Sequence, residues 1–211
     1  DSMLVQPKME IPDLDLVTGV QHYEEEVRGS RFTVAASSFF QVNTSQLSRA
    51  VDEVRELLEL RGDEVMVDAY CGVGVFAVLM SPYVKRVVGI EESVSAIEDA
   101  NLNLNGATNV EFIEGKTEHV MADWQDEDSV DVLLLDPPRV GCHPDVLESV
   151  KKLQPKKVLM ISCEPAAMAR DLDLLCDGGM YQLDTVRPVD MFPQTRHVET
   201  ISVLSFQGIQ G

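Results

Sequence analysis

The sequence predicts an α/β fold in which helices cover both faces of a mostly parallel β-sheet. From residue 65 onward, short apolar runs alternate with stretches of helix-forming residues, a spacing that is typical of βαβ units. The last two apolar runs are separated only by a loop, which favours an antiparallel pair with a C-terminal strand at the sheet edge. With 211 residues, 45% of them hydrophobic and 25% charged, the chain can form one domain with a full core and an appendage.

The strands expected in the parallel part are short runs rich in Val, Ile and Leu. They cover residues 65–69, 86–90, 110–113, 130–135 and 157–161. Helices are expected between them at residues 76–80, 94–105, 144–153 and 165–176. The antiparallel pair is expected within residues 180–193 and 197–206, and the acidic segment 121–130 is expected to be a solvated loop.

One further helix is expected before the first parallel strand, over residues 45–60. Asn43 or Thr44 can cap it, and its apolar residues recur at helical spacing, at Leu47, Ala50, Val51, Val54, Leu57 and Leu58. Two short strands are expected within residues 23–43, around a turn at Arg28 and Gly29. We therefore expect an N-terminal extension of short strands, residues 1–42, followed by the main domain, residues 43–211.

Composition argues against several classes of protein. The 17 basic and 36 acidic residues give a net charge of -19, which argues against a freestanding nucleic-acid binder, because phosphate contacts need Lys and Arg. The four cysteines match no zinc or iron–sulfur spacing, so we expect no metal site. No apolar run approaches the roughly 20 residues that span a bilayer, and no signal peptide is recognisable. A cytoplasmic protein with reduced thiols and no membrane contact is expected.

A glycine-containing turn follows the first parallel strand and indicates a cofactor site. Gly72 and Gly74 let the backbone turn sharply and approach a ligand closely. The next strand ends in Glu91, and an acidic residue about 20 positions after such a turn accepts hydrogen bonds from ribose hydroxyls. A dinucleotide and S-adenosylmethionine both fit this pattern. The dinucleotide fingerprint is met only if Ala77 counts as its third small residue.

A second signal lies at the end of the fourth parallel strand, on the same sheet edge as the glycine turn. Asp136 is followed there by Pro137 and Pro138, which hold the chain in a fixed extended shape. An acidic residue before two prolines is foreign to dehydrogenases and usual in methyltransferases, where it grips the group that is methylated. This corner therefore favours S-adenosylmethionine over a dinucleotide.

Cys163 lies where the fifth parallel strand gives way to a helix, in the stretch LMISCEPAAMARD. A free cysteine is usually a small buried hydrophobe, so the position alone favours packing over reactivity. The alternative is a nucleophile presented at the carboxyl edge of the sheet. The stretch by itself leaves both interpretations open.

Six motifs decide between them: SSFFQVNTSQ, DAYCGVGVF, GIEES, LLLDPPRVG, ISCEPAAMARD and MFPQTRHVE, in this order. In these motifs the sequence resembles the S-adenosylmethionine-dependent RNA uracil-C5 methyltransferases, which make 5-methyluridine in tRNA or ribosomal RNA. The resemblance covers about residues 28–207. It implies a Rossmann-like methyltransferase fold, S-adenosylmethionine as cofactor and RNA as partner.

The resemblance also implies residue roles. Cys163 would be the nucleophile and Glu199 the base that removes a proton from the substrate. Contacts to the cofactor fall on Gln41, Tyr70, Glu91 and Asp136, in addition to Gly72 and Gly74 in the turn. Asp136, Phe40 and Arg139 are expected to contact the substrate.

The sequence departs from the family pattern in three ways. Glu164 stands where Asn usually follows the nucleophile, and Val75 stands where some members have an Asn that contacts the cofactor. The RNA-binding barrel and the cysteine cluster that precede the catalytic domain in some members are missing. Since the chain also begins without Met, we expect a piece of a longer protein that needs a recognition domain absent from this chain. A non-catalytic cofactor- or RNA-binding module, or an NAD-dependent oxidoreductase, are the alternatives.

Overall fold

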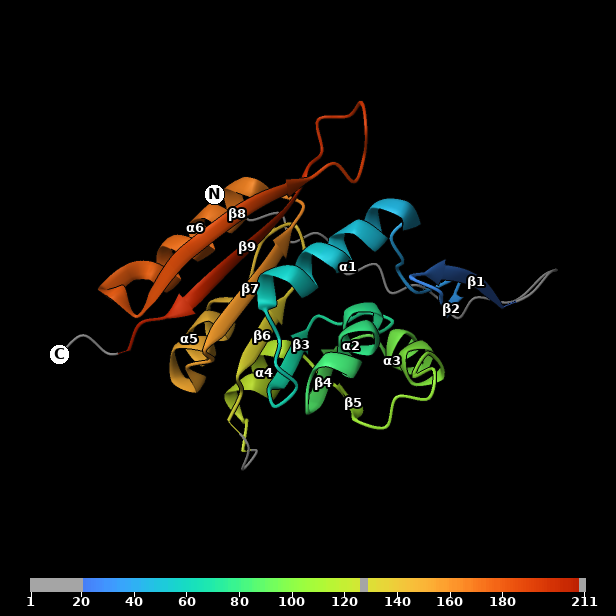
Figure 1. Ribbon diagram of the computed structural model, residues 1–211, viewed down its shortest axis with the longest axis horizontal. Helices are drawn as coiled ribbons and strands as arrows, with labels where there is room; N and C mark the ends of the chain where they lie inside the picture. The colour runs from blue at the N-terminus through green and yellow to red at the C-terminus, as the bar shows by residue number, and fades with distance from the viewer. Residues whose placement is uncertain (1–20, 126–128, 209–211) are drawn as a thin grey trace, which may run out of the picture.

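A seven-stranded sheet forms the centre of the molecule in the computed structural model, which describes residues 21–125 and 129–208 (Figure 1). Its strand order is β5-β4-β3-β6-β7-β9-β8. The bounds are β3 (Val65–Ala69), β4 (Arg86–Glu91), β5 (Val110–Glu114), β6 (Val132–Leu135), β7 (Lys157–Ser162), β8 (Tyr181–Val189) and β9 (Glu199–Phe206). Strands β3 to β7 pair in parallel, and β9 runs antiparallel between β7 and the edge strand β8. The expected mostly parallel sheet with antiparallel C-terminal pairing is confirmed, but the strand at the edge is β8, because the last strand, β9, lies between β7 and β8.

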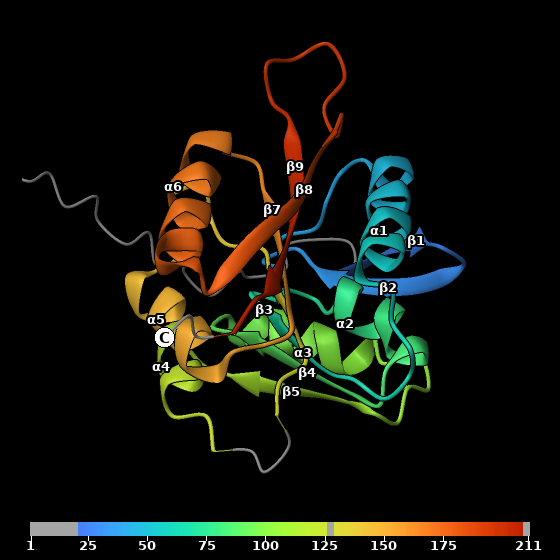
Figure 2. The ribbon, with the colours of Figure 1, turned by 60° about the vertical axis from the view of Figure 1, so that its left-hand side comes forward.

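Helices cover both faces of the sheet, as Figure 2 shows. One face packs against α1 (Thr44–Leu58), α2 (Val75–Met80) and α3 (Val94–Leu102), and the other against α4 (Thr117–Ala122), α5 (Pro144–Leu153) and α6 (Pro165–Cys176). Successive strand residues alternate between the two cores. Met66 joins the first core, for example, and Val67 joins the second. This alternation explains the unbroken apolar runs, because a strand that is covered on both faces needs apolar residues at every position.

One helix was not expected, and several element boundaries differ from the expected ones. Helix α4 was not expected, because it is short and buries only Thr117 and Met121. Its last residues occupy the start of the segment expected to be a solvated loop, part of which lies outside the described residues. Helix α3 ends at Leu102, shortly before two residues with positive φ angles, Asn105 at 49° and Gly106 at 84°. Strand β6 begins at Val132, and the carboxylate of the preceding Asp131 accepts from the Val65 N–H at 2.9 Å.

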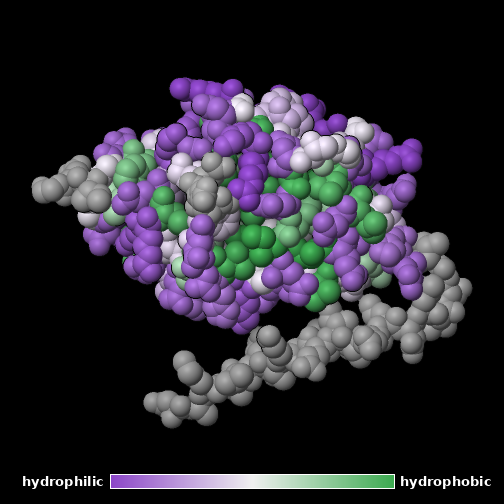
Figure 3. Space-filling view, turned by 90° about the horizontal axis from the view of Figure 1, so that it is seen from below, coloured by the Kyte–Doolittle hydropathy of each residue, from purple (hydrophilic) through white to green (hydrophobic). Residues whose placement is uncertain are grey.

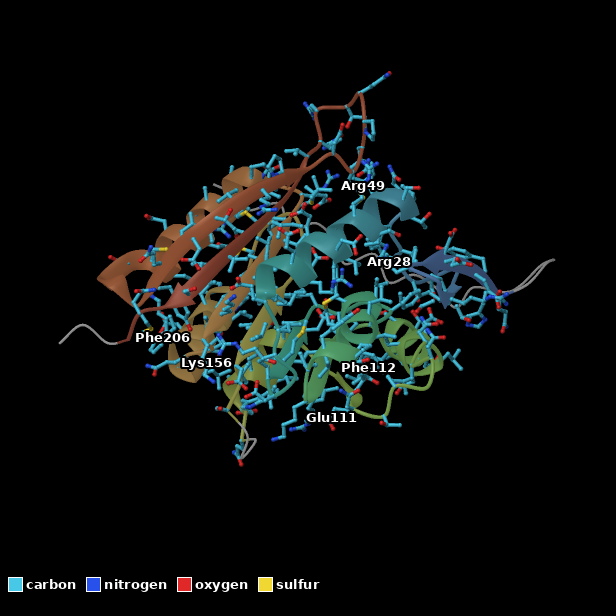
Figure 4. The ribbon with its side chains drawn as sticks, in the orientation of Figure 1. Arg28, Arg49, Glu111, Phe112, Lys156 and Phe206 are labelled. Atoms are coloured by element: carbon cyan, nitrogen blue, oxygen red, sulfur yellow. The ribbon has the colours of Figure 1, made fainter. Side chains whose placement is uncertain are left out.

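The N-terminal hairpin consists of β1 (His22–Val27) and β2 (Ser30–Ala35), which turn at Arg28 and Gly29 with positive φ angles of 54° and 80°. Asn103 holds it to α3, because its side chain accepts from the Thr33 N–H at 2.7 Å and donates to the Thr33 carbonyl at 3.0 Å. Arg28 forms an ion pair with Asp52 of α1 at 3.1 Å, and Figure 4 shows it beside that helix. The hairpin therefore packs on the main body. The division at residue 42 stays a prediction, and residues 1–20 lie outside the described part.

On the face seen in Figure 3, hydrophilic residues lie around the rim and hydrophobic residues gather in the middle. Within the described residues, no helix is both long and apolar enough to cross a membrane.

At the carboxyl ends of the parallel strands, the chain leaves β3 towards β4 on one side, while β6 lies on the other. Such a reversal of strand order opens a crevice where α/β proteins bind ligands.

Candidate active site

A cleft of about 1290 Å³ opens at this reversal. Its walls come from the segment before α1, the turn after β3, the ends of β4 and β6, the loop after β7, and the start of β9. The structure brings together there all but one of the site residues expected from the sequence: Phe40, Gln41, Tyr70, Gly72, Glu91, Asp136, Arg139, Cys163 and Glu199. The exception is Gly74.

The turn after β3 is made by residues with positive φ angles. They are 68° at Tyr70, 53° at Gly72 and 84° at Gly74, and the Gly74 N–H donates to the Cys71 carbonyl at 2.9 Å. Gly72 lines the cleft, but Gly74 caps α2 and does not. A Cβ atom at Gly74 would lie 2.8 Å from the ring of Phe112. Gly74 does not line the cleft, and the cofactor contact expected there stays a prediction. This glycine is required by its φ angle and by packing against a neighbouring strand.

Glu91 connects the first two loops of the site. One of its carboxylate oxygens accepts from the Gly72 N–H at 3.1 Å, and the other accepts from the Ser93 N–H at 2.8 Å. A carboxylate has about four lone-pair positions, so two more donors can be accepted. Glu91 is partly exposed and lines the cleft, which suits an acceptor for a pair of ribose hydroxyls.

Asp68 is a site residue that the sequence reasoning missed. It lies within β3, is 1% exposed and lines the cleft. Neither of its oxygens has a hydrogen-bond partner of normal geometry among the described residues, although the Ala77 N–H lies close enough to favour the charged form. Burial, followed by the nearby Asp136, raises the pKa of Asp68 to about 8. The available signal was a single Asp inside a strand that is otherwise apolar and buried throughout.

The carboxyl groups that line the cleft fit a cationic ligand. The carboxyl groups of Asp68, Asp136 and Glu91 all line the cleft and form a wall of carboxyl groups. Burial, followed by the nearby Glu199, raises the pKa of Asp136 to about 7. S-adenosylmethionine has an ammonium and a sulfonium, which such a wall stabilises, and the unpartnered Asp68 can accept from the ammonium. The pyrophosphate of a dinucleotide would be repelled. No group of side chains that could hold a metal ion is found within residues 21–125 and 129–208.

Cys163, Arg139 and Glu199 form a second cluster in the cleft. Cys163 is partly buried in the loop between β7 and α6, and Glu199 is 6% exposed at the start of β9. Burial and the Glu199 charge raise the pKa of the Cys163 thiol, while the adjacent Arg139 guanidinium opposes this shift. Burial also raises the pKa of Glu199, against the effects of Arg139 and Gln41. The cluster therefore combines a thiol, a carboxyl group that holds its proton more tightly than usual, and a cation that favours both charged forms.

The two adjacent phenylalanines have different environments. Phe40 is 8% exposed and packs against Phe32, with 6.2 Å between ring centroids, whereas Phe39 is 76% exposed. Both touch the cleft. Most of the Phe40 ring belongs to the core, and the substrate contact expected there stays a prediction. Phe39 is the ring that faces solvent.

The chain matches the family model for tRNA (uracil-5-)-methyltransferase over residues 15–206. It belongs to this family. Among curated members of related sequence, an uncharacterized RNA methyltransferase of Listeria innocua is 42% identical over 187 residues, which are 87% of this chain and 41% of the relative. An uncharacterized RNA methyltransferase of Thermosynechococcus vestitus is 40% identical over 92% of this chain and 43% of the relative. The chain thus spans about two-fifths of the length of these relatives.

Solved structures agree with the membership in the tRNA (uracil-5-)-methyltransferase family. The tRNA (uracil-54, C5)-methyltransferase of Pyrococcus abyssi, solved in complex with S-adenosyl-L-homocysteine, matches with a TM-score of 0.75 and 29% identity. The match covers 89% of this chain and 45% of that one. The TYW2 protein of M. jannaschii, solved with AdoMet, is 17% identical with a TM-score of 0.63 and supports the fold alone.

Proposed function

We propose that this chain is the catalytic part of an enzyme that transfers the methyl group of S-adenosylmethionine to carbon 5 of a uridine in RNA. The observation that carries the proposal is the cleft in which Cys163, Arg139 and Glu199 share one space with the carboxyl groups of Asp68, Glu91 and Asp136. Family membership supports this reaction class, and the S-adenosylmethionine-type ligand of the Pyrococcus abyssi neighbour supports the cofactor.

The cofactor, when bound, supplies an electrophilic methyl group on a sulfonium. Carbon 5 of uracil is a poor nucleophile towards it, which is why the chemistry needs Cys163. The Cys163 sulfur, once deprotonated, forms a bond to carbon 6, and the electron pair of the carbon 5–carbon 6 double bond becomes available at carbon 5 for the methyl group. Arg139 assists by favouring the thiolate over the thiol.

Glu199 completes the reaction in the proposed sequence. After methylation, carbon 5 still holds its original hydrogen. The Glu199 carboxylate removes this hydrogen as a proton, the electron pair restores the carbon 5–carbon 6 double bond, and Cys163 leaves as a thiolate. The burial of Glu199 suits this step, because the raised pKa makes its carboxylate a stronger base than an exposed one. The target base has to leave the helical stack to reach the cleft.

Covalent trapping tests the mechanism. RNA that contains 5-fluorouridine should form an SDS-resistant complex with the wild-type protein, because fluorine cannot be removed as a proton. We expect Cys163→Ala to form no such complex and no 5-methyluridine, with S-adenosylmethionine affinity nearly unchanged. Cys176→Ala is the matched control, since Cys176 is partly buried and does not line the cleft. Methyl transfer at the wild-type rate by Cys163→Ala would refute the mechanism.

Glu199→Gln separates the two chemical steps. This variant should methylate once and then accumulate the protein–RNA adduct with ordinary uridine, because elimination needs the base. The adduct is measured by gel and mass spectrometry. If the variant neither turns over nor accumulates an adduct, Glu199 does not act as the base that releases the product.

A further inference from the structure

The loop after Asp136 carries Arg139, yet it has no regular secondary structure of its own. Within the loop, the Gly141 N–H donates to the Pro138 carbonyl at 2.8 Å. This hydrogen bond closes a turn but does not connect the loop to another element. Arg139 is exposed, and a long exposed side chain on an unsupported loop would sample many positions. Its effect on Cys163 and Glu199 therefore depends on what holds the loop.

Two neighbouring residues of α6 hold it. Asp171 is 1% exposed, and one of its carboxylate oxygens accepts from the Cys142 N–H at 2.8 Å. The other oxygen accepts from Arg170, from Nε at 2.9 Å and from Nη2 at 2.6 Å. The same Nη2 donates to the Val140 carbonyl at 2.9 Å. One ion pair thus binds both a backbone N–H and a backbone carbonyl of the loop.

The Asp171 carboxylate accepts three donors from the protein, so its hydrogen bonding is satisfied without a ligand. Gly141 lies between the two attachment points with a φ of +86°, and a Cβ atom there would overlap Arg170 and lie 2.5 Å from Asp171. The loop can approach α6 this closely only because this residue is glycine. The contact between the loop and α6 therefore depends on the charges of Arg170 and Asp171, on their hydrogen-bond geometry and on the absence of a side chain at Gly141.

Helix α6 begins directly after the loop that carries Cys163, at Pro165. The loop of Arg139 is consequently fixed to the same rigid helix that follows the thiol. We propose that Arg170 and Asp171 are positioning residues, which hold the Arg139 guanidinium beside Cys163 and Glu199. Their assignment to a reaction rests on the nucleophile of the proposed function, but their effect on the Cys163 thiol does not.

The rate of Cys163 alkylation by iodoacetamide at pH 8 tests the proposal, with the product quantified by mass spectrometry. The rate follows the thiolate fraction, which Arg139 raises. We expect Asp171→Asn and Arg170→Lys each to slow alkylation about tenfold, the effect of about one pKa unit. Lys at position 170 keeps the positive charge but lacks the fork that reaches both Asp171 and Val140. Asp173→Asn, an exposed carboxyl group on the same helix, is the control and should leave the rate unchanged.

A double-mutant cycle with Arg139→Gln distinguishes positioning from a general loss of structure. If Arg170 and Asp171 act through Arg139, adding Asp171→Asn or Arg170→Lys to Arg139→Gln should not slow alkylation further. Effects that multiply would overturn the proposal, as would wild-type alkylation in folded Arg170→Lys. This variant keeps the test decisive if Asp171→Asn does not fold. If the cycle behaves as predicted while the wild type forms neither 5-methyluridine nor an adduct with 5-fluorouridine RNA even at saturating RNA, the proposed function is rejected and the positioning role of Arg170 and Asp171 stands.

Discussion

Buried carboxyl groups set the chemistry of this cleft at the scale of single residues. Among the described residues Asp68 has no hydrogen-bond partner of normal geometry, and the nearby Glu199 adds to the effect of burial in raising the pKa of Asp136. An isolated buried carboxylate is costly, so these groups hold protons at a pH where exposed carboxyl groups have lost them. A cationic ligand reverses this preference by stabilising the charged forms. The residues proposed to bind the cofactor are thus ones that destabilise the ligand-free fold near neutral pH.

Asp68 is expected to make the stability of the free protein depend on pH. Its pKa is about 8 in the folded state, against about 3.9 in the unfolded chain, so the folded state holds the extra proton between these values. The free energy of unfolding should therefore fall as pH rises through this range, by at most about 1.4 kcal/mol per pH unit from this group. Asp68→Asn should give a flatter profile in urea denaturation from pH 5 to pH 8. Asp136 leaves a residual slope.

Asp173→Asn serves again as the control for this measurement, because Asp173 is exposed. Parallel pH profiles for wild type and Asp68→Asn would contradict the protonated state assigned to Asp68. The same variant should weaken S-adenosylmethionine binding, since an amide cannot provide a charge-assisted acceptor for the ammonium. Calorimetry measures that loss separately from stability.

At the scale of elements, the turn between β3 and α2 is shaped by a side chain from another strand. The Phe112 ring of β5 lies over both Gly74 and Gly89, and a Cβ atom at either glycine would overlap it. Figure 4 labels Phe112 beside α2 and the neighbouring strands. Gly72, by contrast, has no atom within 4 Å of the Cβ position and faces the cleft. Two glycines of one motif therefore have different surroundings, since Gly74 packs against Phe112 and Gly72 lines the cleft.

Gly74→Ala should destabilise the fold more than a positive φ angle alone explains. Gly106 has the same φ of +84° with nothing within 4 Å of its Cβ position, so Gly106→Ala isolates the backbone cost. That cost is about 1 kcal/mol, and the contact with Phe112 should add about 1–3 kcal/mol. Urea denaturation measures both. Phe112→Leu should recover part of the loss in Gly74→Ala, and equal destabilisation by the two alanine variants would show that the ring makes room.

At the scale of the whole molecule, charge opposes nucleic-acid binding. The net charge is -19, and much of the basic complement is occupied in ion pairs, as with Arg28 and Asp52, Lys157 and Glu59, and Arg187 and Glu53. Affinity for RNA comes largely from neutralised phosphates. The chain spans about two-fifths of its curated relatives, so RNA recognition is proposed to involve further parts of the parent protein.

These 211 residues alone should accordingly bind RNA weakly. Filter binding with tRNA and ribosomal RNA fragments at moderate salt should give dissociation constants in the range of non-specific binding, about 10⁻⁴ to 10⁻⁶ M. Under this proposal, adding those further parts should lower the Michaelis constant for RNA more than it changes kcat. Tight and strongly salt-dependent binding by this chain alone would mean that a local basic surface outweighs the net charge.

The sequence alone determined the succession of most strands and helices along the chain and the position of the glycine turn. The periodicity of apolar residues along a short segment shows whether a strand is buried on both faces or a helix on one. The short helix α4 escaped, since six residues contain too little periodicity. Tertiary structure alone decided that Phe40 is buried and Phe39 exposed, that Gly74 packs against Phe112, and that Asp68 has no hydrogen-bond partner in the part of the chain that the structure describes. It also brought Asp171 to Cys142, 29 positions away. Burial, and with it pKa, depends on atoms from distant elements, which no local pattern records.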